Sequence, residues 1–137
     1  MDYYKISEEP FNASQTLKKN GMYRMSVCMA TLAIDLLLKS VLYRINNVSE
    51  LLVGHNHIGI LREIEDQYPK PELRAVVKLS RKYFNDSRYS NNDNISTFTE
   101  NLAADFIEYA QQVKDYVDTD CMATLEDLQK RFNKPLQ

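Results

Sequence analysis

Two charged residues four positions apart, Asp35 and Lys39, interrupt the most apolar stretch of this 137-residue chain. Thr31, Cys28 and Arg24 precede them at spacings of four, three and four, so in a helix all five share one polar line. An acid one turn before a base is the favourable orientation for a helical ion pair, which predicts a local salt bridge at the edge of the core. Alternatively, the line borders a cleft in which Lys39 meets an anionic ligand that Asp35 positions.

The two histidines, His55 and His57, flank Asn56 directly after Gly54. A zinc site would need a third ligand, and the sequence has neither an H-E-x-x-H motif nor a second histidine cluster. We therefore expect no metal. One imidazole should cap the next helix or pack between helices, and the other should be exposed. Imidazole could also transfer protons near neutral pH, but no nucleophile is tied to it in the sequence.

A third group combines cations with aromatic rings between positions 81 and 89. Its members are Arg81, Lys82, Tyr83, Arg88 and Tyr89. Such a set can hold phosphates and stack on a base, as in proteins that bind single strands. The alternative is that Tyr83 belongs to the core, Arg88 caps a helix end and the loop only connects two elements.

Charge is unevenly distributed along the chain. Residues 70–88 carry six basic and two acidic side chains, whereas residues 89–137 carry four basic and nine acidic ones. The basic stretch is either a solvated face that pairs with the acidic last helix or a contact surface for phosphate or nucleic acid. The net charge of -2 and the acidic C-terminal part argue against RNA binding, and no DNA partner is expected.

Only three glycines occur, at Gly21, Gly54 and Gly59. No G-x-G-x-x-G or G-x-x-x-x-G-K-[ST] pattern can be drawn through them, so the usual phosphate-binding loops are absent. Tightly turned sheets and nucleophile elbows also need residues that tolerate positive φ. Any nucleotide site must therefore use side chains that converge between helices.

Composition predicts one folded domain over residues 1–137. A chain with 44% hydrophobic and 26% charged residues can bury one core, and its length is too short for two comfortable domains. Two distant cysteines, Cys28 and Cys121, fit a reducing cytoplasm better than a disulfide framework. The N-terminus lacks a signal-peptide pattern, and the apolar run 31–45 is interrupted by charges and shorter than the ~20 residues that span a bilayer, so no membrane span is expected.

Apolar residues at helical spacing predict an all-α, up-and-down bundle of four to five main helices. The expected segments are about 8–19, 22–46, 58–68, 71–84 and a long helix after Thr97, which is interrupted near residues 118–120 and resumes through Phe132. We expect Ser7 to cap the first helix, with Pro10 in its first turn. Asn20 and Gly21 should end that helix, and Thr97 with Glu100 forms a capping-box pattern.

The segment 22–46 carries two apolar stripes, whereas a surface helix needs one. One stripe holds Met22, Met25, Met29, Leu32, Ala33, Leu36 and Leu37, and the other holds Val27, Ile34, Leu38, Val41, Leu42 and Ile45. Two stripes need two partners. The helix is therefore either central to the bundle or packed against a second subunit, and we expect a homodimer through the second stripe.

In order, these features resemble the HEPN family of small helical, nucleotide-binding bundles. The stretch 33–42, AIDLLLKSVL, is similar to the family's A-x-E-x-x-L-K-A-L-L helix, Gly54-His55 to the start of its next helix, and Arg88-Tyr89 to its R-Y-P element. Asp35 replaces the usual glutamate, Ser40 the alanine and Ser90 the proline. Without the proline, we expect the loop to be less restricted, so the positions of ligand-binding residues in it need not match those of the family.

The resemblance implies a binding protein. Ribonuclease members use an R-x4-6-H motif, but here the arginine would have to lie between positions 48 and 52, where the sequence reads Val-Ser-Glu-Leu-Leu. We therefore expect a non-catalytic member with no cofactor other than a nucleotide ligand. The family implies a small nucleotidyltransferase partner in toxin-antitoxin or defence-like pairs. The alternatives are a homodimeric protein-interaction module without nucleotide binding and, less favoured, RNA binding or RNase activity.

The missing motif makes a direct prediction about RNA. Labelled RNA incubated with the protein in the presence of a chelator should remain intact, because no arginine is placed to hold the phosphate beside either histidine. Gel analysis of the wild type and a His55→Ala variant should give the same result. Metal-independent cleavage that His55→Ala abolishes would contradict this.

Overall fold

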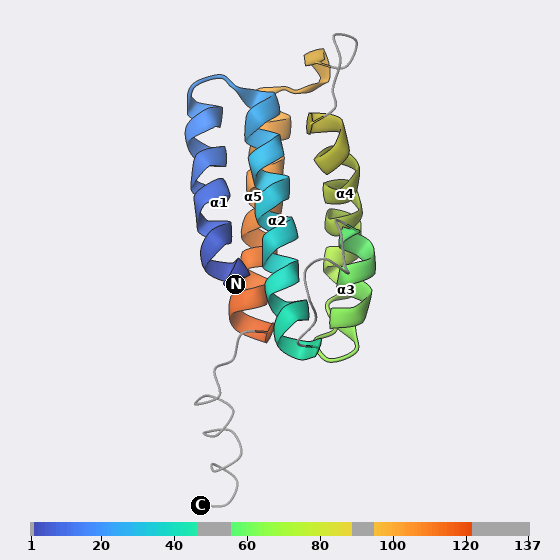
Figure 1. Cartoon of the computed structure of the whole chain (residues 1–137). Helices are drawn as coiled ribbons and strands as arrows, with labels where there is room; N and C mark the ends of the chain where they lie inside the picture. Colours follow the sequence, from blue (N-terminus) through green and yellow to red (C-terminus); the bar gives the residue numbers. More distant parts are fainter. Residues whose placement is uncertain (1, 47–55, 89–94, 122–137) are drawn as a thin grey trace, which may run out of the picture.

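Helices account for most of the chain that the structure describes, a computed structural model covering residues 2–46, 56–88 and 95–121 (Figure 1). The α-helices are α1 (Tyr3–Lys19), α2 (Tyr23–Asn46), α3 (His57–Glu65), α4 (Arg74–Arg88) and α5 (Glu100–Tyr116). Short 3-10 turns, Pro71–Leu73 and Ile95–Thr97, precede α4 and α5, and a π-helical turn, Val117–Cys121, follows α5. The predicted all-α bundle is confirmed.

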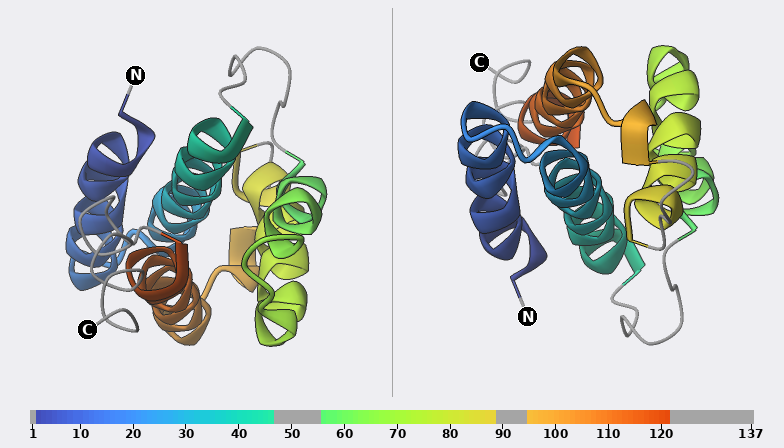
Figure 2. Two further views of the ribbon diagram at one scale, coloured as in Figure 1. Left: turned by 90° about the horizontal axis from the view of Figure 1, so that it is seen from below. Right: turned by 90° about the horizontal axis from the view of Figure 1, so that it is seen from above.

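The long helices alternate in direction. In Figure 1, α1 and α4 run upward and α2 and α5 run downward, while the shorter α3 lies beside the lower part of α4. Viewed along the bundle in Figure 2, α2 lies between α1 on one side and α3 with α4 on the other, and α5 closes a third side. The helix that carries Asp35 and Lys39 is therefore the central one.

The central position of α2 accounts for its two apolar stripes. Val27, Ile34 and Leu38 from the second stripe are fully buried within this single chain. The same holds for Ala33 and Leu37 from the first stripe. The expectation that the second stripe faces another subunit is wrong for the described residues, because α1, α3, α4 and α5 already pack around this helix. A homodimer would have to use a different surface.

Length and composition would allow α2 to cross a membrane. The segment Tyr23–Ile45 is longer than the apolar run expected from the sequence, but 78% of its most apolar window is buried inside the bundle. Core helices of soluble proteins pass the same test, so this property is weak evidence for a membrane span. Its apolar side chains already have protein partners.

The first helix starts earlier than predicted. The Asp2 side chain accepts a hydrogen bond from the backbone N–H of Lys5 at 3.0 Å, so Asp2 rather than Ser7 is the N-cap. Ser7 lies inside the helix, where its hydroxyl donates to the Tyr4 carbonyl. Pro10 consequently sits within α1 and not in its first turn. The helix ends as predicted, with Gly21 at a φ of 75°.

Three other boundaries also differ from the sequence expectation. Thr99, not Thr97, caps α5 by accepting from the backbone N–H of Leu102 at 3.1 Å. Helix α3 ends at Glu65, before Tyr68, and α4 continues to Arg88 through positions expected to form a loop. The last turn of α4 is held by Arg24, whose guanidinium donates to the Ser87 carbonyl at 2.7 Å. The expected continuation through Phe132 lies outside the described residues.

The difference in burial between Leu38 on α2 and Leu79 on α4 predicts that truncation to alanine destabilises the protein far more at Leu38. Leu38→Ala removes a side chain that is 0% exposed and should lower the free energy of unfolding by about 3 kcal/mol. Leu79→Ala, at a side chain that is 40% exposed, should cost less than about 1 kcal/mol. Urea denaturation measures both. Equal losses would contradict the central placement of α2.

Candidate functional site

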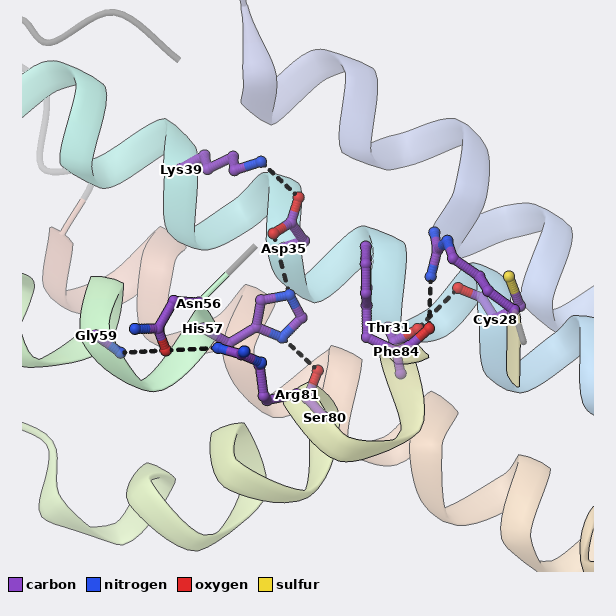
Figure 3. A network of polar contacts seen from close by, with 11 residues as sticks. Cys28, Thr31, Asp35, Lys39, Asn56, His57, Gly59, Ser80, Arg81 and Phe84 are labelled. Atoms are coloured by element: carbon purple, nitrogen blue, oxygen red, sulfur yellow. Dashed lines mark hydrogen bonds and ion pairs between the residues drawn. The ribbon is translucent and has the colours of Figure 1, made fainter. Parts of the chain in front are cut away.

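A buried carboxylate lies at the centre of the polar side chains that the structure brings together (Figure 3). Asp35 Oδ2 is 3.0 Å from Lys39 Nζ, one helical turn away, and Asp35 Oδ1 is 3.0 Å from His57 Nε2 on α3. Asp35 is 1% exposed and Lys39 is 8% exposed. The predicted salt bridge is therefore present, and it lies inside the core rather than at the edge of an open cleft.

His57 extends this contact from α2 to α4. Its Nδ1 lies 3.1 Å from the Ser80 hydroxyl oxygen, and its ring meets Phe84 edge-on with centroids 5.1 Å apart. Because a carboxylate only accepts, Nε2 donates to Asp35, and Nδ1 shares a hydrogen bond with the Ser80 hydroxyl. The expectation that one histidine packs between helices is confirmed for His57. His55 lies outside the described residues.

Ser80, His57 and Asp35 are connected in the same order as the residues of a hydrolytic triad. A serine nucleophile, however, must reach a substrate and needs donors for the developing oxyanion. Ser80 and His57 are both completely buried, and Ser80 lines neither the pocket between α3 and α4 nor the one beside the end of α5. The arrangement is therefore suited to joining three helices and not to attacking a substrate.

The electrostatics of Asp35 reflect a competition between burial and its two partners. Burial raises the pKa of the carboxyl, but the hydrogen bond and charge of His57, together with Lys39, outweigh it and hold the pKa below its ordinary value of 3.8. Asp35 is therefore ionised at neutral pH.

A second contact fixes the start of α3. The side-chain oxygen of Asn56 accepts from the backbone N–H of Gly59 at 3.3 Å and from the Arg81 guanidinium at 2.9 Å. Asn56 is thus the N-cap of α3 and also connects it to α4. A Cβ atom on Gly59 would lie 2.6 Å from Asn56 Nδ2, so this position needs glycine unless the cap moves.

Arg88 behaves as expected for a helix-capping residue. Its guanidinium lies 3.6 Å from the centroid of the Phe84 ring and donates to the Phe84 carbonyl at 3.1 Å. Tyr83 packs edge-on against Phe106, as expected for a core aromatic residue. Tyr89 lies outside the described residues, so the predicted pairing of Arg88 with it stays a prediction.

The structure separates the predicted site residues into two groups. Asp35, Lys39 and His57 form the buried connection, whereas Arg81 on α4 is exposed beside the start of α3 and Arg88 is turned toward Phe84. Sequence reasoning missed Ser80. Ser80 lies three positions after Val77 and four before Phe84, a spacing that places it on the buried face of α4 and could have indicated it. Within the described ranges, no group of three or more histidine, cysteine or acidic side chains could hold a metal ion.

Comparison with known families provides an independent test of the resemblance. The family model described as HEPN domain matches residues 1–120. The chain belongs to the HEPN family. The matched range includes all of α1 to α5, so the helices that hold Asp35, His57 and Ser80 are the HEPN domain itself. No curated protein and no solved structure matches this HEPN chain significantly.

The buried carboxylate of this HEPN protein should contribute strongly to stability. Asp35→Asn leaves the Lys39 ammonium without its counter-charge in a buried place and should lower the free energy of unfolding by about 3 kcal/mol at pH 7. Because the pKa of Asp35 is lowered by folding, its contribution is complete above 3.8 and is lost as pH falls through the lower folded value.

Chemical denaturation between pH 7 and pH 2 tests both parts. The gap between wild type and Asp35→Asn should shrink at low pH, where the wild-type carboxyl is also neutral. Asp105→Asn, at an exposed acid on α5, is the matched control and should change stability by less than about 0.5 kcal/mol. A gap that does not depend on pH would rule out the charge of Asp35 as its cause.

Proposed function

We propose that this HEPN protein is a non-catalytic binding protein whose ligand is a nucleotide, or a nucleotidyltransferase-type partner that presents one. One observation carries the proposal: polar side chains from α2, α3 and α4 converge on one side of the bundle and leave cations exposed beside a closed core. Nucleotide sites built without glycine-rich loops need this kind of convergence between helices.

The non-catalytic part of the proposal is supported by how the polar atoms are used. Asp35 contacts Lys39 and His57, and the second nitrogen of His57 contacts Ser80. A general base must reach the proton that it removes, and a nucleophile must reach the substrate. Asp35, His57 and Ser80 are at most 1% exposed, and Lys39 is 8% exposed. Their polar atoms stabilise the fold.

The binding part is supported by the outer residues. Arg81 is exposed, and its guanidinium has a defined position because it donates to Asn56 at 2.9 Å. An arginine that is already ordered loses less side-chain freedom when it meets a phosphate. The family implies a small nucleotidyltransferase as the protein partner, a toxin-antitoxin or defence-like role and a cytoplasmic location, and these remain part of the proposal.

The nucleotide proposal is tested by thermal unfolding with ATP and with GTP. A ligand at one hundred times its Kd stabilises the folded state by about 2.7 kcal/mol, which should raise the Tm by roughly 8 °C for a chain of this length. Arg81→Gln should reduce the shift, and Lys5→Gln, an exposed change on α1, should leave it intact. The absence of a shift with either nucleotide would rule out nucleotide binding.

A second candidate is a homodimeric protein-interaction module, favoured by the same closed hydrogen-bond chain, which needs no ligand to be complete. Sizing chromatography and partner capture with and without nucleotide distinguish the two. A dimer or a partner complex that does not depend on nucleotide, together with no thermal shift, favours the module.

A further inference from the structure

A basic pocket between α3 and α4 contains none of the individual site residues expected from the sequence, although part of its lining belongs to the basic stretch 70–88. It has a volume of about 520 Å³. Its lining residues are Ile58, Arg62, Glu65, Arg74, Ala75 and Lys78. Ligand pockets for small molecules have volumes of about 300–1,000 Å³, so a mononucleotide or a polyphosphate fits this range. We call this pocket the α3–α4 groove.

The single acid of the groove is already neutralised. Arg74 Nε lies 3.0 Å from both oxygens of Glu65, and Arg74 Nη2 lies 2.6 Å from Oε2. The hydrogen bond from Arg74 lowers the pKa of Glu65 against a smaller opposing effect of burial, and the charge of Arg62 acts in the same direction. Glu65 therefore remains bound to Arg74 as a carboxylate and is not available to either of the other two cations.

Arg62 and Lys78 are the remaining cations of the groove. Both are exposed, and neither forms a hydrogen bond or an ion pair with another residue in the described ranges. They come from different helices, α3 and α4. With three cations and one carboxylate in its lining, the groove has a formal charge of +2. An anion placed between the two helices would meet a cation from each.

The spacing along α4 extends this positive surface. Arg74, Lys78 and Arg81 follow at intervals of four and three, so they share one side of the helix and are separated by about 6 and 4.5 Å along its axis. Ile58 and Ala75 add apolar surface to the same groove. A ligand with several linked anionic groups and a less polar part would match both features.

We propose that the α3–α4 groove binds the phosphate groups of a nucleoside di- or triphosphate, with Arg62 and Lys78 as the direct contacts. Arg74 and Glu65 hold the two helices at the distance that the groove requires, and Ile58 with Ala75 contacts the less polar part of the ligand. The inference rests on the proposed nucleotide binding and assigns its phosphates to Lys78, within the basic stretch 70–88, and to Arg62, which the sequence did not single out.

A phosphate chain fits the groove better than a long polyanion does. Arg62 and Lys78 lie in one groove beside the nine-residue helix α3, whereas a nucleic-acid strand would need a longer basic track. The charge of α5 is mainly negative, and the whole chain has a net charge of -2. The acidic residues of α5 are Glu100, Asp105, Glu108 and Asp115. A long strand would experience this repulsion, but a compact anion in the groove would lie beside the cations.

Isothermal titration calorimetry with pyrophosphate and, separately, with ATP tests the assignment on the full chain at low ionic strength. The double variant Arg62→Gln/Lys78→Gln removes both positive charges and leaves shorter, polar side chains in their place. Lys5→Gln/Lys19→Gln on α1 changes the net charge equally on the opposite side of α2 (Figure 2) and serves as the control. Circular dichroism confirms that each variant is folded.

The expected result is that both ligands bind the wild type, that the groove variant loses at least about tenfold in affinity for each, and that the control changes by less than about twofold. ATP binding that the groove variant retains would overturn the groove while leaving the proposed function intact. Pyrophosphate binding that requires Arg62 and Lys78 without any ATP binding would support the groove as an anion site and overturn the nucleotide function. Equal losses in both double variants would show that only net charge matters and would overturn the groove.

Discussion

A carboxylate cannot be left alone in the middle of a helical bundle, because the loss of its hydration costs several kcal/mol unless other charges and donors replace the water. Asp35 imposes this constraint on the molecule. Lys39 satisfies it within α2, and His57 satisfies it from α3 while Ser80 orients the ring from α4. The relative positions of three helices are therefore coupled to the partners of one side chain. Apolar packing around α2 supplies the burial that makes this coupling strong.

Much of the architecture could be predicted from the sequence, because it depends on periodicity. The two apolar stripes of α2, the stop at Gly21 and the Asp35–Lys39 ion pair are local consequences of helical spacing. The predicted start of α1 at Ser7 was wrong. Asp2 and Ser7 are both suitable N-cap residues in the same stretch, and only the backbone geometry shows that Asp2 is used. The extension of α4 was missed because it depends on Arg24, a residue distant in sequence.

In the candidate site, too, contacts within one helix could be predicted from the sequence and contacts between helices could not. His57 and Ser80 are 23 positions apart, so no spacing rule predicts their contact, and a serine in an amphipathic helix gives little signal by itself. The cations of the α3–α4 groove come from two helices that the Glu65–Arg74 ion pair connects, a contact between residues nine positions apart on different helices. Membership of the HEPN family identified the domain, but the physical arrangement of these side chains separates what holds the fold from what is open to a ligand.

The position of α2 also has a consequence for the dynamics of the chain. All four other α-helices pack on it, and along its length few side chains reach solvent. Its amide protons can exchange with solvent only when most of those neighbours have separated, which places α2 in the unit that opens last. Helix α3 has nine residues and packs mainly on α2 and α4. Opening of α3 therefore withdraws His57 from Asp35 and leaves that carboxylate with Lys39, so a local motion of nine residues changes the charge balance of the core.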